Sequence, residues 1–520
     1  MDADSRTAPR ARKTPAPKPR GRRSAPHSLR DSQPEPLDAI SVIHLTAEYW
    51  PLARTGGLGE AVQGLATYQA ASGQPTAVVL PLYRSVRTTA PDLERVGPPF
   101  TVTLGGRSEQ ASLYRIPAAA ARPDVFLIDH SEYFDRDGIY GADGADYPDN
   151  ARRFAFFCLA AVTALPQIAP GGQVLHAHDW HTALAPVYLR TALAGHEYHS
   201  RMRTVMSVHN AGFQGHFPPE TMADLGLPAA LYTVRVFEWY ERMNFLKGGL
   251  AFSDLAVTVS PTHARELCTQ DGGFGLHDTF TGFGDRLVGI LNGIDPDAWN
   301  PGTDPAITAN YTADDPSPKR ICKNALQRAT GLPERPATPL FGMSARLVAQ
   351  KGLDIVIGAN LAELSDAQFV FLGAGERRYQ LALADLAFAA PQQVAVEFNF
   401  TDRLEHRLLA GADALLMPSL YEPCGLTQMR AQRYGTVPIA RRVGGLADSI
   451  VDGVTGLLFD EYSAPALAAA LERAVSLYRD PPAWHELAGR AMEKPFGWGA
   501  SAARYHEVYR RALASAPAQS

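Results

Sequence analysis

Short runs of apolar and β-branched residues alternate with longer stretches of helical periodicity from Ala39 onward. The first series of these runs lies at residues 41–45, 77–80, 125–128, 173–175, 204–208 and 255–259. Strands that alternate with helices along a chain are typical of a parallel sheet covered by helices. The pattern therefore predicts an α/β domain in the first half of the chain.

A second series of the same kind follows at residues 339–343, 368–372, 394–398, 414–417 and 437–439. Between the two series, residues 300–337 are rich in Pro, Asp and Thr, which favours surface loops with one short helix. At 520 residues the chain also exceeds what one hydrophobic core normally serves. We predict one domain over residues 38–262 and another over 263–494, with a ligand-binding cleft between them.

Composition changes this picture mainly at the N-terminus. The whole chain has 46% hydrophobic and 20% charged residues and a net charge of −5, which are ordinary values for a globular protein. Residues 1–37, however, hold nine Lys/Arg against four Asp/Glu, with seven prolines and almost no large apolar side chain. Such a segment cannot bury enough surface to offset its ordering entropy. We predict a disordered basic tail, a solvated extension rather than an arm for nucleic acid or an anionic surface.

The sequence predicts neither export nor a membrane span. Arg22 and Arg23 precede polar and small residues, where a twin-arginine signal needs an apolar stretch, and the acids and prolines of the tail fit a plastid transit peptide poorly. No run of about 18 apolar residues occurs. The four cysteines show no paired spacing, which favours a reducing cytoplasm and no structural zinc. We expect a cytoplasmic protein without membrane or nucleic-acid partners.

A glycine-rich turn follows the first predicted strand. Arg54 precedes Gly56 and Gly57, and a helical pattern occupies residues 61–71. Glycines at a helix start let backbone N–H groups approach an anion closely, where the helix dipole favours negative charge. The segment fits neither the P-loop pattern nor GxGxxG, which argues against an ordinary kinase or dinucleotide-binding enzyme. A plain strand-to-helix turn is the alternative.

A histidine cluster, His-Ala-His-Asp-Trp-His, occupies residues 176–181 at the end of a predicted strand. Such a cluster is typical of metal ligands. Residues on a strand alternate in direction, however, so His176 and His178 share one face while Asp179 points elsewhere. Three interpretations remain open: metal ligands, structural histidines, or hydrogen bonding to a sugar by His178. We favour the last.

Two cationic residues, Arg346 and Lys351, lie just past the strand predicted at residues 339–343, on a loop that enters a helix. The planar fork of an arginine and the point charge of a lysine can together hold a diphosphate. A solvated loop would carry the same charges, so this signal is weak by itself.

An acidic residue, Glu422, stands at the next such junction, after the strand predicted at residues 414–417. There it can hydrogen-bond sugar hydroxyls and balance a developing positive charge, while the amides near Gly425 and Leu426 face a phosphate. Helix capping is the alternative role for an acid in this position.

Together these segments resemble, in order across about residues 40–515, the bacterial glycogen synthase and plant starch synthase family. Further matches are Tyr-Pro-Asp-Asn at 147–150, Val-His-Asn-Ala at 208–211, Ser-Pro-Thr at 260–262 and Leu-Asn-Gly-Ile-Asp at 291–295. The resemblance implies two Rossmann-like domains of the GT-B type that face each other across a deep cleft. It also implies transfer of glucose from ADP-glucose to the non-reducing end of an α-1,4-glucan, with retained anomeric configuration and without a metal or other cofactor.

The resemblance also implies roles for individual residues. On the donor side it assigns Arg346 and Lys351 to the diphosphate and Glu422 to the glucose, and it places Phe400 against the adenine. Further donor contacts are expected from Arg54, Gly56, Gly57, Gly425 and Leu426, a sugar contact from His178, and the acceptor side of the cleft from Asp149, Asn210 and Trp180. Aromatic residues on that side suit stacking on a glucan, although core packing explains them equally well.

Two residues depart from the family pattern. Arg54 stands where the family usually has lysine, which keeps the charge but widens the group. Phe400 stands where a tyrosine is common, which keeps the stacking face. The apolar pattern of Tyr505, Val508 and Tyr509 predicts a C-terminal helix within residues 495–515, and by resemblance it packs back on the first domain; an ordinary terminal helix on the second domain is the alternative.

Three other functions remain as alternatives: a GT-B enzyme that uses UDP-glucose, an inactive glucan-binding homologue, and a metal-dependent hydrolase suggested by the histidines. In the favoured interpretation, negative charge grows on the leaving phosphate and positive charge on the sugar ring. Arg54, Arg346 and Lys351 would meet the first charge and Glu422 the second. The departing phosphate oxygen could itself take the proton of the acceptor.

Overall fold

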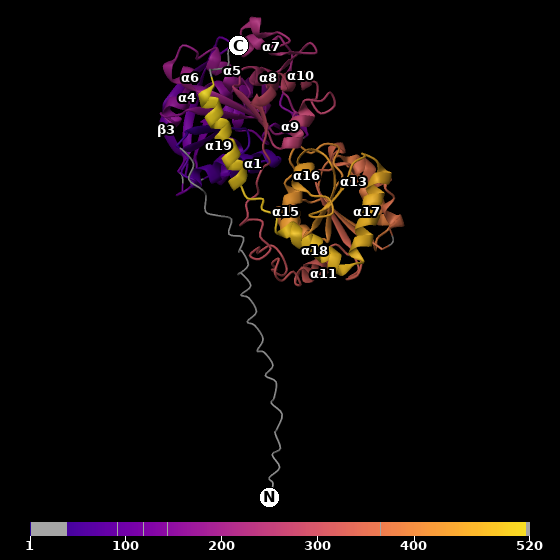
Figure 1. Cartoon of the computed structure of the whole chain (residues 1–520). Helices are drawn as coiled ribbons and strands as arrows, with labels where there is room; N and C mark the ends of the chain where they lie inside the picture. Colours follow the sequence, from indigo (N-terminus) through magenta and orange to yellow (C-terminus); the bar gives the residue numbers. More distant parts are fainter. Residues whose placement is uncertain (2–38, 91, 118, 143, 365, 516–520) are drawn as a thin grey trace.

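Two large sheets, the first mainly and the second wholly parallel, are each covered by helices and organise the chain into two lobes (Figure 1). The computed structural model describes Met1 and residues 39–515 apart from 91, 118, 143 and 365. The predicted tail over residues 1–37 therefore lies outside the described residues, except for Met1. Within the described part, no helix is both long and apolar enough to cross a membrane.

The first lobe contains a nine-stranded sheet in the order β14-β13-β9-β8-β1-β2-β5-β4-β3. Its strands are β1 (Val42–Leu45), β2 (Thr76–Pro81), β3 (Glu94–Leu104), β4 (Arg107–Ile116), β5 (Asp124–Asp129), β8 (Val174–His178), β9 (Arg203–Val208), β13 (Leu255–Thr258) and β14 (Leu287–Gly289). β1 lies at the centre, where it pairs in parallel with β2 and β8. The antiparallel pair β3–β4 forms one edge.

Helices cover this sheet, and one of them forms much of the core. They are α1 (Gly57–Ala71), α2 (Arg84–Thr89), α3 (Ser131–Phe134), α4 (Asn150–Ile168), α5 (Leu184–Arg190), α6 (Glu197–Arg201), α7 (Thr221–Asp224), α8 (Phe245–Ala251), α9 (Pro261–Leu267) and α10 (His277–Phe283). α4 is buried on nearly all sides, and Phe154, Phe156 and Phe157 on it are fully buried. A helix with almost no exposed face belongs in a core, and the buried Arg153 of α4 binds the adjoining loops by donating to the carbonyl oxygens of Tyr133 and Ile139.

The second lobe has a six-stranded, wholly parallel sheet in the order β17-β16-β15-β18-β19-β20. The strands are β15 (Leu340–Ser344), β16 (Gln368–Leu372), β17 (Val394–Glu397), β18 (Ala414–Met417), β19 (Val437–Arg441) and β20 (Leu457–Phe459). The helices are α11 (Lys319–Ala329), α12 (Leu353–Gly358), α13 (Arg377–Ala389), α14 (Asp402–Gly411), α15 (Thr427–Arg433), α16 (Gly444–Ser449), α17 (Ala464–Tyr478) and α18 (Pro481–Met492).

The boundary between the lobes lies later than the sequence predicted. β14 pairs in parallel with β13, so residues 263–289 complete the first sheet instead of opening the second domain at 263. The correction has a simple physical reason, because a strand of three residues carries too little apolar pattern to be recognised along the chain.

The C-terminal helix α19 (Gly499–Ala514) packs on the first lobe although its sequence follows the second. Tyr505, Val508 and Tyr509 on α19 are buried against apolar residues of α1 and the central strands. Figure 1 shows α19, in yellow, beside the indigo α1. The chain therefore crosses between the lobes twice. The two crossings lie side by side, since the Ile294 N–H donates to the carbonyl oxygen of Phe496 at 2.8 Å.

Candidate active site

The carboxyl ends of the central strands in the two sheets face each other, and contacts join them. The Ser260 hydroxyl after β13 donates to the carbonyl oxygen of Pro423 after β18 at 2.7 Å. A Cβ placed on Gly57, at the start of α1, would lie 3.9 Å from Leu426 Cδ1, just before α15. Open α/β sheets bind their ligands at these strand ends. The structure thus brings the predicted glycine turn and the predicted Gly425–Leu426 segment together across the cleft.

Lys351 and Glu422 form an ion pair at the second-lobe edge of the cleft. Lys351 Nζ lies 2.7 Å from Glu422 Oε2, and the Ser419 hydroxyl donates to the same oxygen at 2.9 Å. Glu422 is buried, and its backbone carbonyl accepts the Gly445 N–H at 3.0 Å. Gly444 has φ +42°, and a Cβ there would lie 2.0 Å from the Glu422 carbonyl oxygen. A glycine is therefore required where α16 begins against Glu422.

Arg346 is exposed beside this pair. It follows β15, as Lys351 does, and its side chain has no hydrogen bond or ion pair within the described residues. Its charge influences Tyr421, next to Glu422. One paired cation and one unpaired cation therefore stand at the end of β15, which is the arrangement that a diphosphate can bind.

Phe400 follows β17 and is 42% exposed, so its ring offers a free face.

Gly425 has φ +68°, a conformation that favours glycine, and a Cβ there would lie 2.4 Å from Gln428 Oε1. A side chain at residue 425 would therefore strain the backbone and displace the Gln428 side chain at the start of α15.

Arg54 is held by carboxylates of both lobes. Its guanidinium donates to Glu60 at 2.7 Å and to Asp402 of the second lobe at 2.8 Å, and it stacks over Trp50 at 4.2 Å. Glu60 in turn pairs with Arg430 of the second lobe. Burial opposes the charge of Arg54, but the hydrogen bonds and charges of Asp402 and Glu60 outweigh burial and raise its pKa. Arg54 therefore ties the lobes together as well as facing the cleft.

The sequence reasoning missed Glu48, which organises the glycine turn. Its buried carboxylate accepts the N–H groups of Thr55 at 2.8 Å and of Gly56 at 3.2 Å, and the Tyr140 hydroxyl at 2.6 Å. The Gly56 N–H is therefore already bonded to a carboxylate, and its predicted contact with the donor stays a prediction. A carboxylate eight residues before the first glycine of the turn was the only signal in the sequence.

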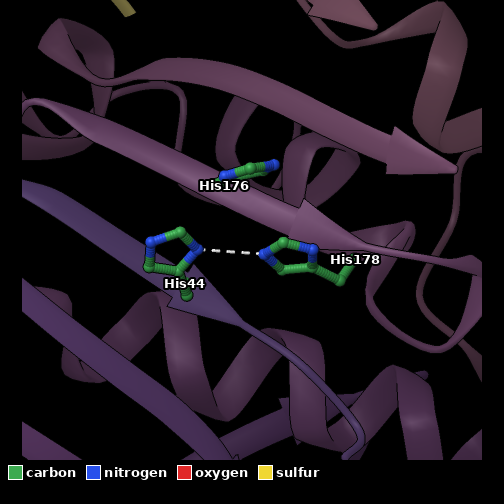
Figure 2. Close-up of side chains that lie close together, drawn as sticks. All are labelled: His44, His176 and His178. Atoms are coloured by element: carbon green, nitrogen blue, oxygen red, sulfur yellow. Dashed lines mark hydrogen bonds between the residues drawn. The ribbon is translucent and has the colours of Figure 1, made fainter. Parts of the chain in front are cut away.

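The histidines of β1 and β8 lie inside the first lobe (Figure 2). His178 is 1% exposed, and its ring bonds His44 at 3.0 Å and His209 at 2.9 Å. Both ring nitrogens of His178 are therefore already hydrogen-bonded, and a sugar contact from this side chain stays a prediction that would require one of these bonds to be replaced. His209, after β9, is only half-buried. It is the histidine at the cleft edge that the sequence reasoning did not select.

Burial keeps these rings neutral. It lowers the pKa of His44 to about 4 and of His209 to about 3, and it places those of His176 and His178 well below the usual value. Ring nitrogens of His44, His176 and His178 lie within 4.8 Å of one another, a spacing that could hold a metal ion. Each of their six nitrogens is already hydrogen-bonded, however, so a metal would have to replace those bonds.

Asp179 anchors the half-buried histidine. Its φ of +57° is unusual for a residue with a side chain, and its carboxylate accepts the His209 N–H at 2.7 Å. Burial raises the pKa of Asp179 to about 7, although hydrogen bonds from the His209 and Asn210 N–H groups oppose the shift.

The three residues predicted for the acceptor side differ in position. Asp149 is the residue before α4, and its carboxylate accepts two hydrogen bonds from the Arg136 guanidinium, at 2.8 and 2.7 Å. Asn210 follows His209, is half-buried, and hydrogen-bonds the Tyr421 side chain next to Glu422. Trp180 is packed between core residues, with Phe154 at 5.2 Å and Phe217 at 5.7 Å between ring centroids. Core packing therefore explains Trp180, and only Asn210 is brought to Glu422.

Two Rossmann-like lobes, with cations and a carboxylate at facing strand ends, define a glycosyltransferase of the GT-B type. Comparison with known proteins supports this class. Residues 41–282 match the family model "Starch synthase catalytic domain", and residues 327–489 match "Glycosyl transferases group 1". The solved catalytic domain of starch synthase IV from Arabidopsis thaliana, bound to ADP and acarbose, superposes with a TM-score of 0.83 at 32% identity, over 92% of this chain and 100% of that one.

Curated relatives narrow the class further. The chain is 42% identical to a glycogen synthase of Syntrophotalea carbinolica and 40% identical to glycogen synthase 2 of Geobacter sulfurreducens, each over 91% of this chain and 99% of the relative. A sucrose-phosphate synthase of Thermosynechococcus elongatus, at 17% identity and a TM-score of 0.58, shares the fold. The chain belongs to the glycogen and starch synthase family and is a glycosyltransferase with the function of that family. The predicted resemblance, fold class and function are thereby confirmed.

Proposed function

We propose that the protein transfers glucose from ADP-glucose to the non-reducing end of an α-1,4-glucan, with retention of anomeric configuration. The observation that carries the proposal is the Lys351–Glu422 pair at 2.7 Å, with the unpaired Arg346 beside it. The names of the glycogen synthase relatives, and the ADP and acarbose bound to the starch synthase, support this donor and this acceptor.

The ion pair suggests how donor binding prepares the site. When a diphosphate arrives, Lys351 can turn from Glu422 to the phosphate, where Arg346 and Arg54 add charge. Glu422 is then free to accept hydroxyl hydrogen bonds from the glucose and to face the positive charge that grows on its ring. The exposed face of Phe400 takes the adenine by stacking.

The bonds and protons of the transfer balance with the two substrates alone, and no further reactant is needed. The bond between glucose C1 and the β-phosphate oxygen breaks, and the acceptor hydroxyl oxygen forms the new bond to C1 on the same face. The departing phosphate takes the hydroxyl proton, so the products are ADP and a glucan longer by one glucose. Because the three cations supply the charge that a metal would supply elsewhere, we propose that neither a metal nor another cofactor takes part.

Incorporation of labelled glucose into glycogen from ADP-glucose and from UDP-glucose, with and without a chelator, tests the proposal. We expect growth of the polymer from ADP-glucose in both conditions, and loss of transfer in Glu422→Gln. Glu363→Gln removes an exposed acid of the same lobe and serves as the control. No growth with either donor would refute the function, a preference for UDP-glucose would refute the donor, and loss of activity with chelator would refute the metal-free mechanism.

A further inference from the structure

A line of hydrogen-bonded side chains runs from the centre of the first lobe to its cleft edge. Gln69 on α1 bonds His44 on β1 at 2.8 Å, His44 bonds His178 on β8 at 3.0 Å, and His178 bonds His209 after β9 at 2.9 Å. Gln69, His44 and His178 are buried, whereas His209 is half-buried. Its Nδ1 is neither buried nor bonded to any residue that the structure describes. The line therefore ends in a ring nitrogen that a ligand can reach.

The rings in this line are neutral, so each has one nitrogen that donates and one that accepts. In a chain of such rings, the direction of the first hydrogen bond determines the direction of all the others. If His44, the ring nearest α1, donates from Nε2 toward α1, every later ring must donate toward α1 as well. The tautomer of His209 is thus decided at the buried end of the line.

Gln69 fixes that end because its amide has two different partners. Its oxygen accepts from His44 Nε2, and its NH2 group donates to the Tyr509 hydroxyl on α19 at 3.2 Å. With the proton on Nε2, His44 Nδ1 must accept from His178 Nε2. His178 Nδ1 must then accept from His209 Nε2. His209 is left with an unprotonated Nδ1 toward the cleft.

A second branch of hydrogen bonds starts at the same Gln69 amide, and its donors and acceptors are fixed in the same way. The Tyr509 hydroxyl, which accepts from Gln69, donates to His176 Nδ1 at 2.9 Å. His176 Nε2 is then the protonated nitrogen and donates to the Ser207 hydroxyl at 2.7 Å. Every group in the two branches has one consistent role, which is the condition for a buried polar network to specify one arrangement.

We propose that Gln69 and Tyr509 are positioning residues that hold His209 in the tautomer with an unprotonated Nδ1, which accepts a hydrogen bond from a hydroxyl of the transferred glucose. This inference rests on the proposed function. Positive charge grows on the sugar ring during transfer, and a lone pair facing a sugar hydroxyl stabilises it. An N–H donor or an imidazolium in the same place would oppose it.

Nitrogen NMR of protein labelled in histidine with ¹⁵N tests the tautomer directly. In the wild type we expect His209, assigned by its loss in His209→Gln, to show a protonated Nε2 and an unprotonated Nδ1. Tyr509→Phe removes the hydroxyl that orients the Gln69 amide, and Gln69→Leu removes the amide itself. We expect both variants to give His209 signals averaged between the two tautomers. Unchanged signals in both would overturn the proposal.

Transfer kinetics give the second readout. We expect kcat to fall at least about tenfold in Tyr509→Phe and Gln69→Leu with KM for ADP-glucose unchanged, since a wrong tautomer can cost up to about 10⁴-fold where histidine is a general base. Tyr188→Phe is the matched control, because Tyr188 is an equally buried tyrosine of the first lobe whose hydroxyl donates to the carbonyl oxygen of Leu225 at 2.8 Å, outside both branches. It should keep both the tautomer and kcat.

An equal loss of kcat in Tyr188→Phe and Tyr509→Phe would show that the loss of a buried tyrosine hydroxyl, not the tautomer, causes the effect, and would overturn the proposal. If the wild type itself transfers no glucose from either nucleotide sugar, the proposed function fails. The His209 nitrogen signals would then still decide whether Gln69 and Tyr509 set the tautomer.

Discussion

The two walls of the cleft use opposite electrostatic strategies. The second lobe presents charges: an exposed Arg346, and Lys351 paired with Glu422. The first lobe presents a neutral side, where buried imidazoles are joined to one another and only His209 approaches the surface. The difference suits a reaction that separates charge, because the leaving phosphate needs cations and the sugar needs acceptors without positive charge. Substitutions on the charged wall, acid on the neutral wall and exchange of Arg54 between them separate the two contributions.

The largest effect is expected from Lys351→Ala on the charged wall. Loss of a preorganised group at a developing charge typically costs about 10² to 10³ in kcat, and Glu422 would also lose its partner. Rates of glucose transfer measure the effect. Arg479→Ala, which removes an exposed cation of the same lobe, should leave the rate unchanged. A rate in Lys351→Ala near that of the wild type would mean that this wall does not neutralise the phosphate.

Acid should destabilise the neutral wall. Burial lowers the pKa of His44 from 6.5 to about 4, so the unfolded chain binds the proton first, and stability falls as pH falls from about 6.5 to about 4. That shift in pKa corresponds to a loss of roughly 3 kcal/mol in the free energy of unfolding from this histidine alone. Asp179 has the opposite effect on stability. Because burial raises its pKa to about 7, the folded chain binds this proton first, which stabilises the fold as pH falls below about 7. Because the depressed histidines outnumber it, the net effect of acid is a loss.

Urea unfolding midpoints at pH 7.5, 6 and 5 measure this loss. His44→Gln removes one titrating ring and should make the midpoint less sensitive to pH, although it lowers stability at neutral pH. Midpoints that do not change with pH in the wild type would show that the buried rings are not kept neutral by the fold.

Phe400→Ala tests the adenine contact at the edge of the charged wall. Stacking of a base on an aromatic ring contributes about 1–3 kcal/mol, so we expect KM for ADP-glucose to rise about tenfold or more, with little change for Phe400→Tyr. Phe388→Ala is the control, since Phe388 is 89% exposed on α13 of the same lobe. Equal KM values in the two alanine variants would remove Phe400 from the donor site.

The smallest effect is expected where the walls meet. Lysine in place of Arg54 keeps the charge but cannot donate to Glu60 and Asp402 as a fork does. Since ion pairs near the surface contribute up to about 1 kcal/mol, and those of Arg54 are part-buried, we expect KM for ADP-glucose to fall by less than about fivefold, as the cation is released toward the donor. Arg84→Lys, at an arginine that also bridges two acids, is the control. A rise in KM would mean that the fork itself binds the phosphate.

The sequence was most informative where strands are buried on both faces. The central strands such as β1, β16 and β18 were predicted because an uninterrupted apolar run marks them. The edge strand β3 is mostly exposed, so its residues show no apolar run, and β14 is too short to show one. Both were missed for these reasons.

The residues of the candidate site also differ in how well the sequence predicts them. Lys351 and Glu422 were found because each follows a predictable strand, where parallel sheets bind ligands. Glu48 was missed because its role depends on backbone groups that only the folded turn brings to it. His178 and His209 both stand at strand ends and look equivalent along the chain. Only the packing of β1 and α19 against β8 buries the first and leaves the second at the surface.

The return of α19 to the first lobe makes the second lobe an insertion within the first. Residues from about 290 to 495 leave the first lobe and come back to it beside the point of departure, where Ile294 bonds Phe496. During synthesis, the sheet of the second lobe can therefore be complete before the apolar face under α19 is covered. The first lobe therefore begins to fold first and is completed last. Truncation within α19 should expose the core of the first lobe and leave the second lobe able to fold.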